Sequence, residues 1–159
     1  MRHRVDPNAV GFLVTDLARL IRAEFDRRIG DAALGVTAGE ARALSHAARA
    51  GTVRQAVLAE RMGVEAMTLS GYLDRLEARG LVTRSADPAD RRAKLVRLTD
   101  AADAVLADIE RVAAGIRAQV AGSMTAGEWE AFIGALAAAR DNLAAARCAP
   151  GREPADAGP

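Results

Sequence analysis

The stretch that decides the fold is Gln55–Asp74, which reads QAVLAERMGVEAMTLSGYLD. It holds what a helix-turn-helix requires: a small residue where two helices meet, a glycine at the turn, and apolar residues that fix the second helix. Ala59 is the small contact, and Gly63, four residues later, allows a left-handed turn. The residues expected between the two helices and toward the core are Leu58, Met62, Val64, Leu69 and Tyr72.

The second helix of this stretch carries a different set of side chains on its opposite face. We expect the outward surface to consist of Met67, Thr68, Ser70, Gly71 and Arg75. Short hydroxyl side chains and an arginine suit base edges and phosphates in a major groove. Taken alone, the same stretch also fits an ordinary αα-hairpin whose outer face is solvated.

A hairpin is predicted directly after the two helices. The runs Leu81–Arg84 and Leu95–Leu98 are rich in Val, Leu and Thr, and they flank the polar segment Ser85–Lys94. Its tip reads DPADRR from Asp87 to Arg92. An arginine at such a tip can enter a narrow minor groove, where the negative potential of DNA is strongest. The alternative, a solvated charged turn, is less compatible with the order helix-turn-helix and then hairpin, which is typical of a winged helix.

Helical segments are predicted on both sides of this region. Val10 and the apolar residues after it recur at helical spacing and predict a first helix from about Asn8 to Ile29, before a break at 30–35. A Thr followed three residues later by Glu or Gln forms a capping box, which starts a helix. This pattern occurs at Thr37–Glu40, Thr52–Gln55 and Thr125–Glu128. The helix that starts at the Thr37 pattern is expected to end near Ala50. Two further helices are expected, one over Asp100–Val120 and one over Glu128–Arg147.

Composition and charge limit what this chain can be. Its 159 residues suffice for one compact domain. Hydrophobic residues make up 50% but aromatic residues only 3%, so the core must consist of Ala, Leu, Val and Ile, and helices that bury surface in a partner are expected. The net charge is +1, yet 52–99 holds nine basic and six acidic residues, whereas 100–148 holds four basic and seven acidic ones. A basic middle indicates an anionic partner there.

Several other classes of protein find little support. The single cysteine, Cys148, excludes an intrachain disulfide and fits a reducing compartment. No apolar run of membrane-spanning length occurs, and Val10–Ile21 is interrupted by Asp16 and Arg19, so we expect neither a signal peptide nor a membrane span. A cytoplasmic protein is expected.

Catalytic and metal chemistry are not expected either. His3 and His46 are isolated from other metal-binding residues, so neither a metal site nor a cofactor is predicted. Ser45 and His46 are adjacent on a helix and therefore point apart, which argues against a nucleophile and its base. We expect no enzyme.

Five runs of this sequence resemble the DNA-binding lobe of MarR-type regulators. They are Gln55–Val64, Met67–Ser70, Asp74–Val82, Asp87–Val96 and Leu98–Thr99. The DP-x-DRR wing that ends in LT is the most specific of them. The resemblance covers Thr37–Thr99 closely, while the flanking helices match only in length and order.

The resemblance implies a mostly α (α+β) fold. A winged helix-turn-helix lobe at 37–99 would lie between N- and C-terminal dimerisation helices at 8–36 and 100–148, within one domain at 1–148. The tail, 149–159, is expected to be disordered.

The resemblance also implies a homodimeric, sequence-specific regulator, with repression as the expected mode, on a palindromic operator of double-stranded DNA. Thr68 and Ser70 would touch bases, Arg75 a base or a phosphate, and Gln55 a phosphate. Arg92 would enter the minor groove, oriented by Asp90 and assisted by Arg91. The remaining candidate DNA contacts are Met67, Gly71 and Arg84. At Gly71 many relatives carry a longer polar residue, often arginine, so this glycine removes a base contact.

Two further expectations stay open. In such regulators, phenolic acids or other anionic aromatics bind between the dimerisation helices and the lobe and weaken DNA binding. Arg19, Arg42 and His46 are weak candidates for such a contact, and we assign no ligand site. The alternative function is a winged-helix protein-interaction module without DNA binding, which the basic residues Arg75, Arg84, Arg91 and Arg92 disfavour.

Overall fold

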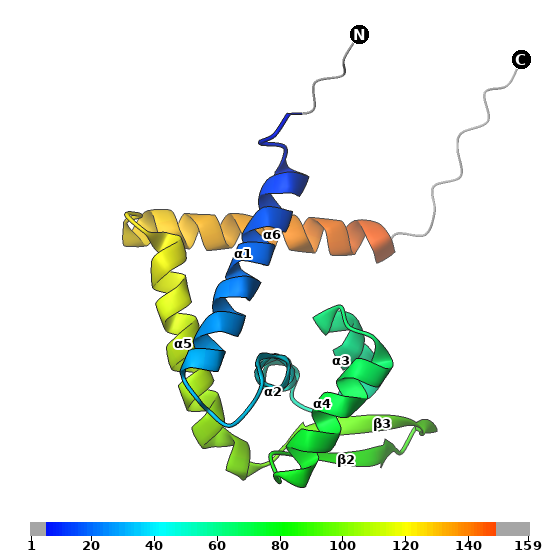
Figure 1. The fold of residues 1–159 in the computed structure, drawn as a ribbon. Helices are drawn as coiled ribbons and strands as arrows, with labels where there is room; N and C mark the ends of the chain where they lie inside the picture. The colour runs from blue at the N-terminus through cyan, green and yellow to red at the C-terminus, as the bar shows by residue number, and fades with distance from the viewer. Residues whose placement is uncertain (1–5, 149–159) are drawn as a thin grey trace, which may run out of the picture. The chain divides into compact units, whose positions relative to one another are not determined.

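The computed structural model describes residues 6–148, so His3 and the tail at 149–159 lie outside it. The elements within these residues are shown in Figure 1. They are α1 (Val10–Asp31), α2 (Ala38–Ala50), β1 (Val53–Arg54), α3 (Gln55–Met62), α4 (Ala66–Ala78), β2 (Val82–Asp87), β3 (Asp90–Leu98), a 3₁₀ turn η1 (Asp100–Ala102), α5 (Asp103–Ala121) and α6 (Ala126–Cys148). The chain forms two compact units, the first ending at Arg117 and the second beginning at Ala118.

The predicted helix-turn-helix is confirmed as α3, a turn and α4. Gly63 ends α3 in the left-handed conformation with φ 62°, and the N–H of Val64 returns to the carbonyl oxygen of Ala59. Leu58, Ala59, Met62 and Leu69 are buried, and Val64 and Tyr72 are half-buried against the same core. The larger fully buried side chains are aliphatic, as the composition predicts: Ile29, Leu44, Leu58, Leu69, Leu73, Leu76, Val82 and Val96.

The predicted wing is also confirmed, but its strands are longer than expected. Most of the polar segment Ser85–Lys94 is strand, and β2 and β3 meet at a two-residue turn, Pro88-Ala89. Ala86 pairs with Lys94 while Asp87 pairs with Asp90, so Arg91–Ala93 bulge out of β3. Backbone pairing therefore continues almost to the tip, which fixes a segment whose sequence reads as a loop.

The capping box predicted at Thr52–Gln55 is wrong. Val53 and Arg54 instead form β1, in which Val53 is buried and pairs with Val96 of β3, completing a sheet of order β1-β3-β2. Thr52 Oγ1 accepts a hydrogen bond from Arg97, and α3 begins at Gln55 without a side-chain cap. Val53 is β-branched and suits a buried strand position, so the chain joins the sheet before α3 begins.

The capping boxes at Thr37 and Thr125 are confirmed, each with reciprocal bonds between the Thr and the Glu three residues later. The first helix continues two residues past its expected end, to Asp31, and the helix expected from Asp100 starts with the 3₁₀ turn.

Helix α2 packs closely on α4 at Gly39. A Cβ atom on Gly39 would lie 2.7 Å from the hydroxyl oxygen of Tyr72 and even closer to the ring, which real side chains do not do. The absence of a side chain at residue 39 therefore lets the Tyr72 ring lie on the first turn of α2.

This contact predicts that Gly39→Ala destabilises the protein. The chain contains TAGE twice, at 37–40 and 125–128, and a Cβ on Gly127 would meet nothing within 4 Å. Gly127→Ala is thus a control with the same local sequence at the same helical position. Overpacking costs about 1–3 kcal/mol, so we expect Gly39→Ala to lie on the order of 1 kcal/mol or more below Gly127→Ala in unfolding free energy. Equal urea midpoints for the two variants would contradict the packing described.

Candidate nucleic-acid interface

Helix α4 presents the face that the sequence predicts. Leu69, Leu73 and Leu76 are buried and fix the helix on the lobe. Met67 is 88% exposed and Thr68 is exposed, whereas Ser70 and Gly71 are half-buried. The first turn of α4 is therefore the most accessible part of this face.

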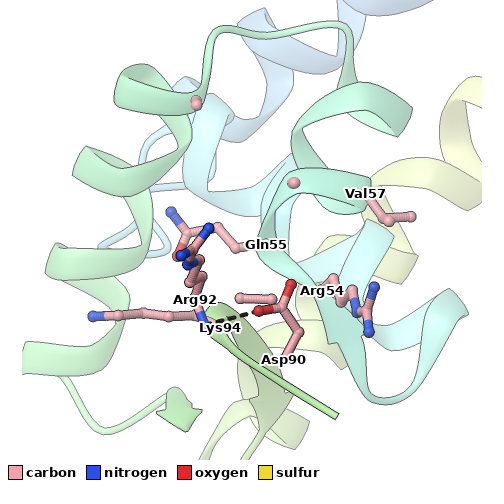
Figure 2. Close-up of a pocket in the computed structure, with 9 residues that line it drawn as sticks. Arg54, Gln55, Val57, Asp90, Arg92 and Lys94 are labelled. Carbon is pink, nitrogen blue, oxygen red and sulfur yellow. Dashed lines mark hydrogen bonds between the residues drawn. The ribbon is translucent and has the colours of Figure 1, made fainter. Parts of the chain in front are cut away.

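The N-termini of α3 and α4 both lack a side-chain cap. Their first backbone N–H groups, at the positive end of each helix, suit an anion. A groove of about 530 Å³ opens beside them and is shown in Figure 2. Its lining residues are Arg54, Gln55, Ala56, Val57, Ala66, Asp90, Arg92, Ala93 and Lys94.

Three of the residues that line this groove are cationic and one is acidic. The side-chain oxygen of Gln55 is buried without a hydrogen-bond partner among the described residues. A groove with helix N-termini on one side and Arg92 and Lys94 on the other can receive a phosphate group.

The wing is fixed to β1 through Asp87. This side chain is almost buried, and its carboxylate accepts hydrogen bonds from the N–H of Ala89 at 2.9 Å and from Arg54 Nε at 2.6 Å. The Ala89 N–H and then Arg54 hold the pKa of Asp87 below its usual value. Arg54 was not among the residues predicted for the site, because its partner lies 33 residues away and no local pattern marks it.

The residues predicted at the wing tip are exposed, but Asp90 acts differently from the prediction. Its carboxylate accepts the backbone N–H of Arg92 at 3.0 Å, rather than holding the guanidinium of Arg92 (Figure 2). Asp90 thus shapes the bulge from which Arg91 and Arg92 project. Both arginine side chains are exposed.

Arg84 is placed away from the predicted surface. Its side chain is only 14% exposed and pairs with Glu77 and Asp74, each at 2.6 Å. The bond with Glu77 raises the pKa of Arg84 and lowers that of Glu77. Arg84 therefore ties β2 to α4, and its guanidinium is already paired within the lobe.

Arg75 also has a partner within the protein. Its Nε donates to the buried carboxylate of Glu40, and its guanidinium lies 5.6 Å from the centre of the Tyr72 ring. Burial alone would raise the pKa of Glu40, but the N–H of Thr37 and the Arg75 side chain outweigh it and lower that pKa. The Arg75 side chain is nevertheless 56% exposed, so part of it remains on the outer face of α4.

The three residues considered for an anionic ligand are not equivalent. Arg19 pairs with Asp16 at 3.4 Å, and Arg42 pairs with Asp26. Arg19 also lines a hollow of about 590 Å³ along α1, and His46 lines another of about 420 Å³ with Arg49 and Arg61. Burial, followed by Arg49 and Arg61, lowers the pKa of His46. Within residues 6–148, no group of three or more His, Cys, Asp or Glu side chains is placed to hold a metal ion, and no helix is long and apolar enough to span a membrane.

Comparison with known proteins identifies the family. The MarR family model matches residues 36–94. Transcriptional regulator PA3341 is 39% identical, with a TM-score of 0.68 over 84% of this chain and 96% of that one. The chain belongs to the MarR family.

Two more distant structures agree. A MarR-family regulator from Silicibacter pomeroyi is 27% identical, with a TM-score of 0.72 over 85% of this chain and 90% of that one. Bordetella bronchiseptica BpsR, whose DNA binding is regulated by 6-hydroxynicotinic acid, is 27% identical, with a TM-score of 0.66 over 87% and 98%. Membership in the MarR family confirms the winged helix-turn-helix fold and the expected class, a DNA-binding transcriptional regulator.

The Asp87 contacts make a pH-dependent prediction about the MarR wing. Because folding lowers this pKa from 3.8, the carboxylate stabilises the protein above pH 3.8 and loses its effect as the pH falls through the folded value. Asp87→Asn keeps an acceptor for Ala89 but loses the ion pair with Arg54. We expect its melting temperature to fall less steeply than that of the wild type between about pH 5 and pH 3.

Glu130→Gln, which removes one exposed carboxylate from α6, controls for the change in net charge. Parallel curves for Asp87→Asn and the wild type would show that Asp87 does not stabilise the wing through its charge.

Proposed function

We propose that this chain is a sequence-specific regulator that binds a palindromic operator as a homodimer, with α4 in the major groove and the wing at the minor groove. One observation carries the proposal. The uncapped starts of α3 and α4 and the arginine-bearing bulge of β3 border one basic groove, next to the exposed first turn of α4. Helix N-termini and cations position a DNA backbone, while an exposed helix face reads bases.

Seven of the predicted contacts have a role in this proposal. Thr68 and Met67, on the exposed first turn of α4, touch base edges, and the half-buried Ser70 contributes its hydroxyl beside them. Gln55, at the start of α3, binds a phosphate. Arg92 enters the minor groove with Arg91 beside it, and Asp90 holds the backbone of the bulge.

A homodimer is supported by apolar surface that each unit leaves exposed. On α1 the exposed large apolar residues are Val10, Phe12, Leu13, Val14, Leu20 and Ile21. On α6 they are Ile133, Leu136 and Leu143, and no described residue of α6 is buried. Surfaces of this kind mark interaction sites. We propose that a second copy covers them, which places two winged lobes on two half-sites.

Release by a small anionic or aromatic ligand is the regulatory part of the proposal. The DNA binding of BpsR is regulated by 6-hydroxynicotinic acid. In this chain the hollow at His46, Arg49 and Arg61 offers cations without a carboxylate in its lining. A ligand could bind more tightly to a dimer whose two lobes are spaced so that they do not fit both half-sites. Such a ligand would increase the population of that dimer and lower its affinity for DNA. Repression by occupying a promoter is the expected mode.

The DNA-binding proposal is tested with Arg92→Ala. We expect wild-type protein to select a palindrome from a random DNA pool and to bind the DNA beside its own gene in a salt-dependent way. Arg92→Ala should weaken binding on the order of 10-fold and flatten the dependence of log Kd on log salt by about one unit. Arg111→Ala removes an exposed arginine from α5, outside the groove, and should change neither quantity.

If the wild type selects no sequence at low salt, the protein-interaction module becomes the better assignment for this winged helix. Equal losses in Arg92→Ala and Arg111→Ala would instead show that only the total charge matters.

The homodimer is tested with Leu20→Glu and Leu136→Glu, which place a charge on the exposed apolar surfaces of α1 and α6. Burying an unpaired carboxylate is strongly unfavourable, so sedimentation velocity should show dissociation at concentrations where the wild type is dimeric. Ser85→Glu adds the same charge at an exposed position of β2 and should remain dimeric. A wild type that sediments as a monomer at all concentrations would refute the proposal.

A further inference from the structure

Gly71 lies in the interior of α4, where glycine is less favourable than alanine. Apart from its neighbours in the chain, the side chain nearest to Gly71 is that of Arg75, which uses the space that a larger side chain would fill. A Cβ atom on Gly71 would lie 3.7 Å from Nη1 of Arg75, one turn later. Helical side chains lean toward the N-terminus of their helix, and here Arg75 reaches back over Gly71. The Arg75 guanidinium thus lies at the level of residue 71, and the Arg75 side chain remains more than half exposed.

Two contacts hold the guanidinium there. Its Nε donates to Glu40, and its carbon lies 5.6 Å from the centre of the Tyr72 ring. Tyr72 is itself positioned by its contact with Gly39. The Nη1 and Nη2 groups make no hydrogen bond with other described residues, so the end of the side chain remains available as a donor pair.

Glu40 is in turn fixed by its place in the fold. Its side chain is only 5% exposed, and its second oxygen accepts the N–H of Thr37 at 2.8 Å as part of the capping box of α2. Because both oxygens have partners, the carboxylate has little freedom to rotate. The start of α2 therefore sets the position of the Arg75 guanidinium on α4.

We propose that Arg75, held over Gly71, is the principal base-reading group of this helix, and that Glu40 is a positioning residue for it. This inference rests on the proposed DNA binding. The target chemistry is guanine, whose O6 and N7 acceptors match the paired N–H donors of an arginine in the major groove. An arginine held by Glu40 loses less conformational entropy on binding than one that moves freely. Residue 71 therefore has no side chain that could contact a base, and the space beside Gly71 is taken by Arg75.

The competing interpretation is an ion pair that only stabilises the lobe. In that case loss of Arg75 would lower stability and reduce binding to all sequences alike. A specificity readout separates the two interpretations, because only a base-reading arginine changes the preference at one position.

The test measures base preferences by selection from a random DNA pool, followed by affinities for every single-base variant of the selected operator. Arg75→Ala should lose its preference for G·C at one position in each half-site, on the order of 10- to 100-fold, and retain the other preferences. Arg75→Lys, which keeps the charge but not the paired donors, should lose the same preference. Melting temperatures show that each variant is folded.

Glu40→Gln should weaken preference at that same position only. Thr37→Ala removes the hydroxyl of the same capping box but leaves the Glu40 carboxylate, so it should alter stability without altering any preference. At residue 71, Ala meets Arg75 at an ordinary contact distance and should preserve the preference, whereas Leu should displace the guanidinium and abolish it.

Selective binding that keeps every base preference in Arg75→Ala would overturn this inference while leaving the proposed function intact. Identical preference profiles for Glu40→Gln and Thr37→Ala would overturn the positioning role of Glu40. Absence of selective binding by the wild type would overturn the proposed function and this inference together.

Discussion

The position of the recognition helix depends on the first turn of α2. Within a few residues this turn forms a capping box, buries the Glu40 carboxylate and, at Gly39, makes room for the Tyr72 ring. Glu40 in turn holds Arg75 of α4. A buried carboxylate without its partners would be strongly unfavourable, so α2 and α4 have one relative position in which these groups are all satisfied. DNA reading by a helix requires that kind of fixed placement.

A second constraint is the shortage of large apolar side chains. The lobe solves it by burying leucines of α2, α3 and α4 and valines of the sheet against one another. Within the described residues, α1 and α6 do not bury their large apolar side chains in this way, because most of them remain exposed. In this MarR chain, a partner copy would supply the missing core, so stability and the spacing of two DNA-reading lobes would have the same origin.

The sequence predicts the elements whose signals are local. Gly63 and the apolar residues around it mark the helix-turn-helix, and the Thr37 and Thr125 patterns mark two helix starts. The same capping pattern fails at Thr52, because Val53 pairs with Val96, a residue 43 positions later that the local pattern does not include. The candidate site likewise has features that follow from local sequence and features that depend on distant residues. The outward face of α4 is predictable from helical spacing, whereas the partners of Arg54 and Arg75 lie 33 and 35 residues away.

These long-range ion pairs reduce the positive charge that the lobe has available for binding DNA phosphates. The sequence gives this region nine basic residues, but Arg54, Arg75 and Arg84 each have a carboxylate partner within the lobe. Within the groove, attraction to phosphates therefore falls largely to Arg92, Lys94 and the uncapped helix N-termini. Compensation of three of the nine positive charges weakens non-specific binding to any DNA. In the proposed dimer, affinity would come mainly from matching bases and from binding two half-sites at once, so dimerisation would matter for selectivity as much as the reading helix.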